Sequence, residues 1–236
     1  MFLKYGFFGT ILLILIVVTN NKIFPNNYEK VNIETIKSEI SDEKSNYFYP
    51  ELFARYSAND TNLHLDDYRR LYYGHSLQPY FNPSLTQLHD SVIALRKYLY
   101  QKEISFERVI ELAGFVLRLD PFFIDGVHLT ALSYDKTGKP EQASLWMDKY
   151  IKLIKTIWAS GNGKTPETAF TVLSVSDEYA ILDALGLEFK EQKLVEINGK
   201  FYDILYVNEN DRGYEQFYFD INLFYEKSLI NNQDKR

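Results

Sequence analysis

The chain of 236 residues contains no cysteine. This absence excludes disulfide bonds, thiol catalysis and cysteine-ligated metal sites, and it excludes lipidation of a mature N-terminal cysteine. Histidine is scarce, with four residues at positions 64, 75, 89 and 128. None pairs with another at the His-x-x-x-His spacing of a helical zinc site. We therefore expect neither a metal site nor a cofactor.

A concentration of positive charge is also missing. Lys and Arg number 26 against 32 Asp and Glu, which gives a net charge of −6 at pH 7. Nucleic-acid binding depends on clustered lysine and arginine side chains that neutralise phosphates, and no segment forms such a cluster. A nucleic-acid partner is therefore not expected.

Two short motifs imitate catalytic signatures but lack the context that the chemistry needs. The segment at 161–165 ends in Gly-Lys-Thr, yet Trp158 occupies the position of the first glycine of a phosphate-binding loop. Asp135 begins an Asp-Lys-Thr-Gly sequence like that of phosphoryl-accepting enzymes, but it follows Tyr134 on an amphipathic helical segment and not on a buried strand. No catalytic residue is expected from either motif.

Aromatic residues, in contrast, are abundant. The chain has 19 Tyr and 17 Phe, and 46% of its residues are hydrophobic. Aromatic side chains bury large areas, so a chain of this length can form a core of ordinary size without disulfides.

The N-terminus predicts export. Lys4 precedes an uncharged apolar run at residues 5–18, which would rise about 21 Å as a helix. This is shorter than the ~30 Å hydrocarbon core of a bilayer and matches the apolar part of a signal peptide. Residues 18–21 offer no small-residue cleavage site, so residues 2–18 could instead stay as an inner-membrane anchor. We expect residues 1–20 to be a signal peptide or a membrane anchor, with the rest of the chain facing outward.

Composition divides the remainder of the chain. Residues 21–46 are polar and weakly periodic, which is typical of a linker with at most a frayed helix. A compact domain is expected at 47–228, with a helical part at 47–159 and a sheet part at 165–228. Residues 229–236 form a polar tail.

Apolar residues recur at helical spacing through the first part of this domain. His64 is expected to cap a short early helix that Gly74 ends. Four longer stripes follow, at 85–99, 106–117, 124–134 and 143–157.

The segment 120–143 resembles one helix pair of a tetratricopeptide repeat. Small Ala131 and Ala143 stand where paired helices touch, and Gly138 permits the turn between them. A stack of such repeats needs about three units, whereas this chain has one clear pair and a degenerate partner at 106–119. We therefore predict a repeat-like hairpin.

Strand patterns dominate the second part. Residues 169–175 and 217–225 alternate in polarity, and 194–207 contains Asn198-Gly199, the dipeptide of a type I′ hairpin turn. A short helix capped by Ser176 lies between them. Helices followed by a small four-stranded antiparallel sheet define an α+β fold.

Carboxylates are one candidate for a functional site. Asp177 and Glu178 fall in the first turn of the expected helix, where the helix dipole alone can account for them. Alternatively they cluster with Asp203 on the sheet, next to Tyr179, and could then serve as an acid/base pair or bind a small ligand.

An aromatic cluster is the other candidate. Tyr72, Tyr73 and Tyr80 flank Gly74, and such side chains can stack on sugars or peptides. Aromatic residues at the end of a helix can equally belong to the core, so both interpretations remain open.

Several segments together resemble a bacterial family, domain of unknown function 4919, over about residues 47–227. The similar segments are Tyr49-Pro-Glu-Leu-Phe-Ala-Arg-Tyr, Asn59-Asp-Thr, Tyr68-Arg-Arg-Leu-Tyr-Tyr-Gly74, Ser160-Gly-Asn-Gly-Lys-Thr-Pro-Glu-Thr-Ala-Phe170, Asp177-Glu-Tyr179 and Phe217-Tyr-Phe-Asp-Ile221. The resemblance implies an exported protein of Bacteroides-like bacteria and implies no activity. His64 departs from the family, where a threonine cap would be expected.

The leading functional hypothesis is an exported binding or scaffold module of the bacterial envelope, without catalysis. Its partner would be another envelope protein or a small ligand, and the N-terminal segment would contact the membrane if it is not cleaved. The alternatives are an Asp/Glu-dependent hydrolase built on Asp177, Glu178 and Asp203, and a purely structural envelope protein.

Overall fold

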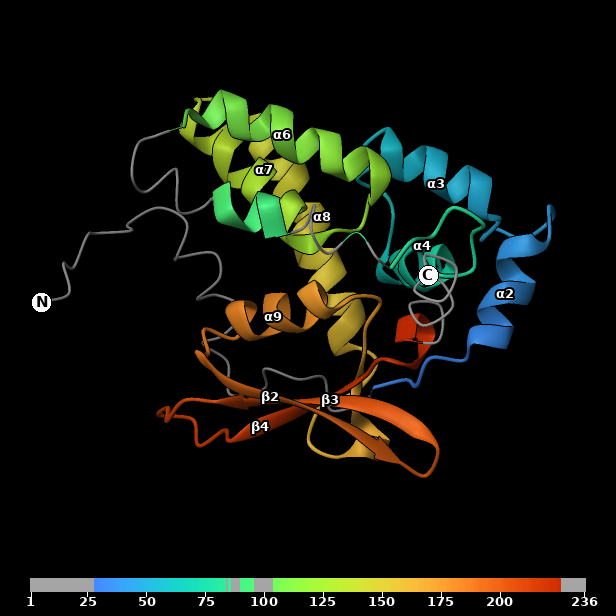
Figure 1. The fold of residues 1–236 in the computed structure, drawn as a ribbon. Helices are drawn as coiled ribbons and strands as arrows, with labels where there is room; N and C mark the ends of the chain where they lie inside the picture. The colour runs from blue at the N-terminus through green and yellow to red at the C-terminus, as the bar shows by residue number, and fades with distance from the viewer. Residues whose placement is uncertain (1–27, 84, 86–89, 96–103, 226–236) are drawn as a thin grey trace, which may run out of the picture.

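The computed structural model describes residues 28–83, 85, 90–95 and 104–225. Figure 1 shows helices above a sheet, with one helix, α9, lying between the two. The sheet has four strands. The predicted α+β class is confirmed. The helices run α2 Ile33–Ser41, α3 Tyr49–Ser57, α4 Leu65–His75, α6 Phe106–Leu119, α7 Ile124–Lys136, α8 Pro140–Trp158 and α9 Val175–Ala184. Residues 90–95 are also helical.

Side-chain caps fix where several helices begin. The side chain of Asn32 accepts a hydrogen bond from Thr35 N at the start of α2, and Ser105 does the same for Arg108 N at the start of α6. Ser174, not the predicted Ser176, caps α9 by accepting from the backbone N–H of Asp177. Each cap satisfies an N–H that would otherwise lack an acceptor within the helix.

The core includes a segment that the sequence assigned to a linker. Ile36 and Ile40 of α2 are buried and join the same hydrophobic cluster as the later helices.

The position of Gly74 also differs from prediction, because it lies inside α4 and does not end it. A Cβ at Gly74 would stand 3.0 Å from Ile40 Cδ1 and 3.3 Å from the Tyr49 ring, so the missing side chain allows α2 and α3 to approach α4.

The predicted helix pair at 120–143 is present as α7 and α8, which pack against each other and are joined at Gly138. Gly138 has a φ of 70°, in the left-handed region that glycine tolerates. On the other side, α6 packs against α7, so the three helices stack in chain order (Figure 1).

The sheet consists of β1 Phe170–Thr171, β2 Phe189–Ile197, β3 Lys200–Val207 and β4 Gln216–Asp220, in the order β1-β4-β3-β2. The β2–β3 hairpin turns at Asn198 and Gly199, both with positive φ, as a type I′ turn requires. The sheet is mixed and not fully antiparallel, because β1 pairs with β4 in parallel.

Several strand boundaries also differ from prediction. β2 begins at Phe189, five residues before the predicted start of the hairpin at 194. β1 is only two residues long because Ser174 begins a helix so soon after it. Residues 222–225 are helical and do not extend the last strand.

Among the described residues, no helix is long and apolar enough to cross a membrane. The apolar segment at 5–18 and the tail at 229–236 lie outside those residues, as do parts of the stripe predicted at 85–99.

Candidate functional site

The predicted aromatic cluster is mostly interior. Tyr72 and Tyr73 are fully buried on α4. The Tyr72 hydroxyl donates to Asp177 Oδ2 at 2.7 Å, and the Tyr73 hydroxyl donates to the carbonyl of Thr171 at 3.1 Å. Burial raises the pKa of both phenols. These side chains therefore join α4 to the sheet part of the fold and do not form a surface on which a ligand could stack.

The remaining two members of that cluster have separate surroundings. Gly74 is enclosed by Ile40 and Tyr49, as described above. Tyr80 is 57% exposed, and its ring centroid lies 5.7 Å from that of His75. The four residues do not share one ligand-facing surface.

Two of the three predicted carboxylates do meet. Glu178, in the first turn of α9, hydrogen-bonds the carboxyl group of Asp203 on β3. A hydrogen bond between two carboxyl groups needs a proton on one of them. Gln192 on β2 supports the pair by donating from Nε2 to Asp203 Oδ2 at 2.8 Å and to Glu178 Oε2 at 3.4 Å. Tyr179 completes this network, because its hydroxyl donates to Gln192 Oε1 at 2.8 Å.

Burial explains the ionisation of this pair. Glu178 is 0% exposed and Asp203 is 5% exposed. Burial, followed by the negative charge of Asp203, raises the pKa of Glu178 well above its usual value. Burial also raises the pKa of Asp203. Of the two carboxyl groups, Glu178 is therefore the one that its surroundings more strongly favour in the protonated form.

Asp177 points elsewhere. Its carboxylate accepts hydrogen bonds from the Tyr72 hydroxyl and, at 3.3 Å, from the backbone N–H of Leu173. The structure thus places Glu178 and Asp203 in one buried pair and Asp177 in a separate contact with α4. Because the pair is covered, a substrate cannot reach it in this conformation.

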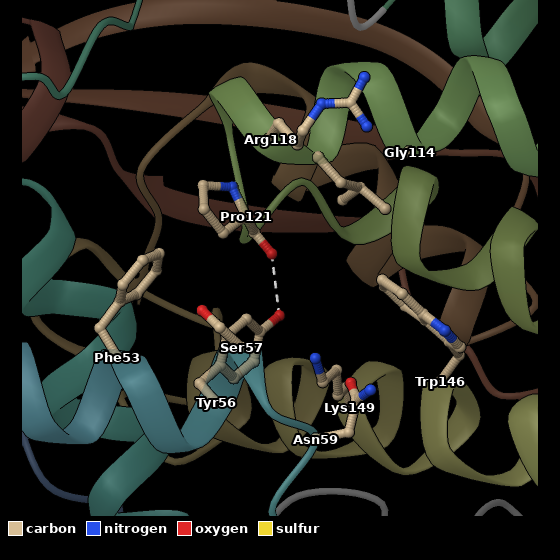
Figure 2. A pocket seen from close by; sticks show the side chains of 10 residues that line it. Phe53, Tyr56, Ser57, Asn59, Gly114, Arg118, Pro121, Trp146 and Lys149 are labelled. Atoms are coloured by element: carbon tan, nitrogen blue, oxygen red, sulfur yellow. Dashed lines mark hydrogen bonds between the residues drawn. The ribbon is translucent and has the colours of Figure 1, made fainter.

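A pocket of about 400 Å³ opens elsewhere in the helical part, between α3, α6 and α8 (Figure 2). Its walls are mainly apolar. The residues that line it are Phe53, Tyr56, Ser57, Asn59, Gly114, Leu117, Arg118, Pro121, Trp146 and Lys149. This volume falls within the range of small-molecule sites.

Two features keep the pocket open. The Tyr56 hydroxyl donates to the carbonyl of Pro121 at 2.8 Å, which ties α3 to the turn after α6 (Figure 2). Gly114 presents no side chain, and a Cβ built there would have only Arg118 Nη1 nearby, at 4.0 Å. The opening therefore persists because α6 has its smallest residue at this position.

Lys149 supplies a positive charge inside this pocket. Its side chain lies between two aromatic residues (Figure 2), with Nζ 4.1 Å from the centroid of Tyr56 and 4.8 Å from that of Trp146. The residue is only 5% exposed, and burial lowers the pKa of its ammonium to about 8.

Sequence reasoning missed this pocket because its lining residues come from three distant helices. One signal was available. Lys149 stands three residues after Trp146 and four before Leu153, and so shares their face of α8. A lysine on the inward face of an amphipathic helix is a buried cation that needs an explanation.

A second hollow, of about 300 Å³, lies beside β1 and the β2–β3 turn. Its charged lining is mixed, with Lys30 and Lys200 together with Glu167 and Asp220. Hydrogen bonds from its own backbone and from Thr165, and to a lesser extent the charge of Lys30, lower the pKa of Glu167, so its carboxylate already has partners within the protein. The α3–α6–α8 pocket, with its single buried cation, is therefore the better candidate site.

Within the described ranges, no group of three or more His, Asp or Glu side chains is placed to hold a metal ion. Neither the curated proteins nor the solved structures contain a match to the chain. The model of a family, domain of unknown function DUF4919, matches residues 34–229. This match begins within α2 and covers most of the chain, so the protein belongs to the DUF4919 family.

Proposed function

We propose that this protein is a non-enzymatic binding module of the bacterial envelope, and that it binds its ligand in the pocket between α3, α6 and α8. The pocket itself supports this proposal, because it combines apolar walls with one buried cation, the usual composition of a ligand site. The stacked helices α6, α7 and α8 also favour binding, since tetratricopeptide-like helix stacks present such grooves to partners.

The alternative of an Asp/Glu-dependent hydrolase has less support. Two of its three carboxylates are brought together, but both are covered by protein and Asp177 contacts α4 instead.

Export remains part of the proposal and rests on the apolar segment at 5–18 behind Lys4. The intact mass of the protein from a fractionated native host tests it. A mass lacking about the first twenty residues in the soluble envelope fraction, or a full-length mass in the membrane fraction, agrees with the proposal. Full-length protein in the cytoplasm contradicts it.

Binding is tested by filling the pocket from Gly114. We expect Gly114→Leu to place a side chain in open space and to abolish binding of apolar probes, measured by isothermal titration calorimetry with octanoate and 1-octanol. Gly114→Ala is the matched control, because it makes the same backbone change and leaves the pocket open. Failure of both probes to bind, or equal binding to the Leu and Ala variants, would refute the pocket as the binding site.

A further inference from the structure

Lys149 determines which chemical class of ligand the pocket suits. A buried ammonium is costly unless an anion or several acceptors compensate the lost hydration. Within the described part of the chain, neither a carboxylate nor a hydrogen-bond acceptor is paired with Lys149 Nζ. The rings of Tyr56 and Trp146 provide only cation–π attraction.

Lys152, one turn further along α8, forms an ion pair with a carboxylate, the usual arrangement for a lysine that is largely covered by protein. Its ammonium lies 2.7 Å from Asp148 Oδ2 and donates to the carbonyl of Thr61 at 3.3 Å. The two lysines are on the same helix, yet among the described residues only Lys152 is paired with an anion. The ammonium of Lys149 faces the pocket instead, where a bound ligand can supply the anion.

We propose that the pocket binds small apolar carboxylates, with the ligand carboxylate accepting hydrogen bonds from Lys149 and its apolar chain lying against Phe53, Leu117 and Trp146. This inference rests on the proposed binding function and adds the ligand class to it. A carboxylate satisfies the ammonium by a charge-assisted hydrogen bond, which is roughly twice as strong as a neutral one. The apolar walls then bury the remainder of the ligand.

The rest of the lining agrees with an anionic ligand. Arg118 lies at the rim, where its guanidinium points away from the centre of the pocket (Figure 2), 5.6 Å from the centroid of Phe115. It adds positive potential without occupying the space. None of the described residues that line the pocket is Asp or Glu, so a carboxylate entering it meets no like charge from them.

Lys149 also gives the binding a pH dependence. With a pKa of about 8, its ammonium is present at pH 7 and largely deprotonated at pH 9.5. The other charged or titratable groups around the pocket are Arg118 from α6, Tyr56 from α3, Asp120 acting on Tyr56, and the Lys152–Asp148 pair on α8. Burial raises the pKa of Tyr56 well above its usual value, so its phenol does not titrate in this range. If only the ammonium form binds, the affinity for a carboxylate should fall roughly thirtyfold between pH 7 and pH 9.5.

The test is calorimetric titration of the full chain with octanoate and with 1-octanol, which share a chain length and differ in charge. We expect octanoate to bind at least about tenfold more tightly, as one hydrogen bond to a charged group implies. Lys149→Met should reduce octanoate affinity to that of the alcohol. Lys149→Arg should retain affinity and lose the pH dependence between 7 and 9.5.

Lys152→Met is the matched control, since it removes the same charge one turn away, and circular dichroism of each variant confirms that it is folded. N-acetyl-dileucine with a free or an amidated C-terminus distinguishes a peptide C-terminus from a fatty acid as the source of the carboxylate. Tighter binding of either acid than of its neutral analogue supports the proposal.

Equal affinity for octanoate and octanol, both lost in Gly114→Leu, would overturn the carboxylate inference while leaving the pocket as a binding site. Equal loss of octanoate binding in Lys149→Met and Lys152→Met would also overturn it. Absence of binding by every probe would overturn both proposals.

Discussion

Replacing Glu178 with glutamine should flatten the pH dependence of the protein's stability. The carboxyl group of Glu178 is buried against Asp203 and keeps its proton in the folded state. In the unfolded chain the same group ionises near its ordinary pKa of about 4.3. Raising the pH above that value therefore favours unfolding, because only the unfolded state releases the proton.

The size of the effect follows from one proton. Between the unfolded pKa and the raised folded pKa, each pH unit removes about 1.4 kcal/mol from the free energy of unfolding. The total loss grows with the separation between these two pKa values. The contribution is fully present below the unfolded pKa and disappears as the pH rises toward the folded pKa. A glutamine amide stays neutral and can donate to Asp203 as the protonated carboxyl does, so the variant lacks this loss.

The assay is urea unfolding at pH 5, 6 and 7, followed by the fluorescence of Trp146 and Trp158. Plotted against pH, the free energy of unfolding should fall less steeply for Glu178→Gln than for the wild type, by about 1.4 kcal/mol per pH unit. Glu191→Gln, at an exposed position on β2, is the matched control and should follow the wild type. Parallel slopes for wild type and Glu178→Gln would refute the shared buried proton.

Three further substitutions test other parts of the fold by the same unfolding measurement. Tyr72→Phe removes the hydroxyl that donates to Asp177 and accepts from Leu173 N, so it should cost about 1–3 kcal/mol; a change below about 0.5 kcal/mol would contradict that role. Ile40→Ala should cost about 2–5 kcal/mol because Ile40 is buried under α4, whereas a neutral result would return α2 to the linker predicted from sequence. Gly114→Ala should stabilise α6 by about 0.5–1 kcal/mol, since alanine has the higher helix propensity and meets open space; destabilisation would show that the pocket wall is tighter than described.

The sequence predicted those elements that local chemistry determines. Periodicity located α6, α7 and α8, and Asn198-Gly199 located the β2–β3 turn, because each depends on residues close together in the chain. The errors arose where tertiary packing decides. The segment containing Ile36 and Ile40 is polar enough to suggest a linker. The structure shows that these two isoleucines pack into the core and that their helix, α2, contacts α4.

Candidate sites followed the same division. Sequence reasoning left a cluster of Asp177, Glu178 and Asp203 open as an alternative, and it could not show that Glu178 and Asp203 are covered by protein. The aromatic residues around Tyr72 suggested a ligand surface. In the structure the hydroxyls of Tyr72 and Tyr73 instead donate hydrogen bonds to residues about a hundred positions later in the chain. The pocket at Lys149 was missed because it exists only once α3, α6 and α8 have assembled.

The hydroxyl contacts of α4 also bear on how the chain folds. Tyr72 and Asp177 are separated by 105 positions, and Tyr73 and Thr171 by 98. Contacts of such high sequence separation form slowly and late. Until the segment around residue 177 has left the ribosome, the hydroxyls of Tyr72 and Tyr73 lack these two acceptors. The helical half alone therefore lacks contacts that stabilise α4. We expect the two halves to unfold as one cooperative unit.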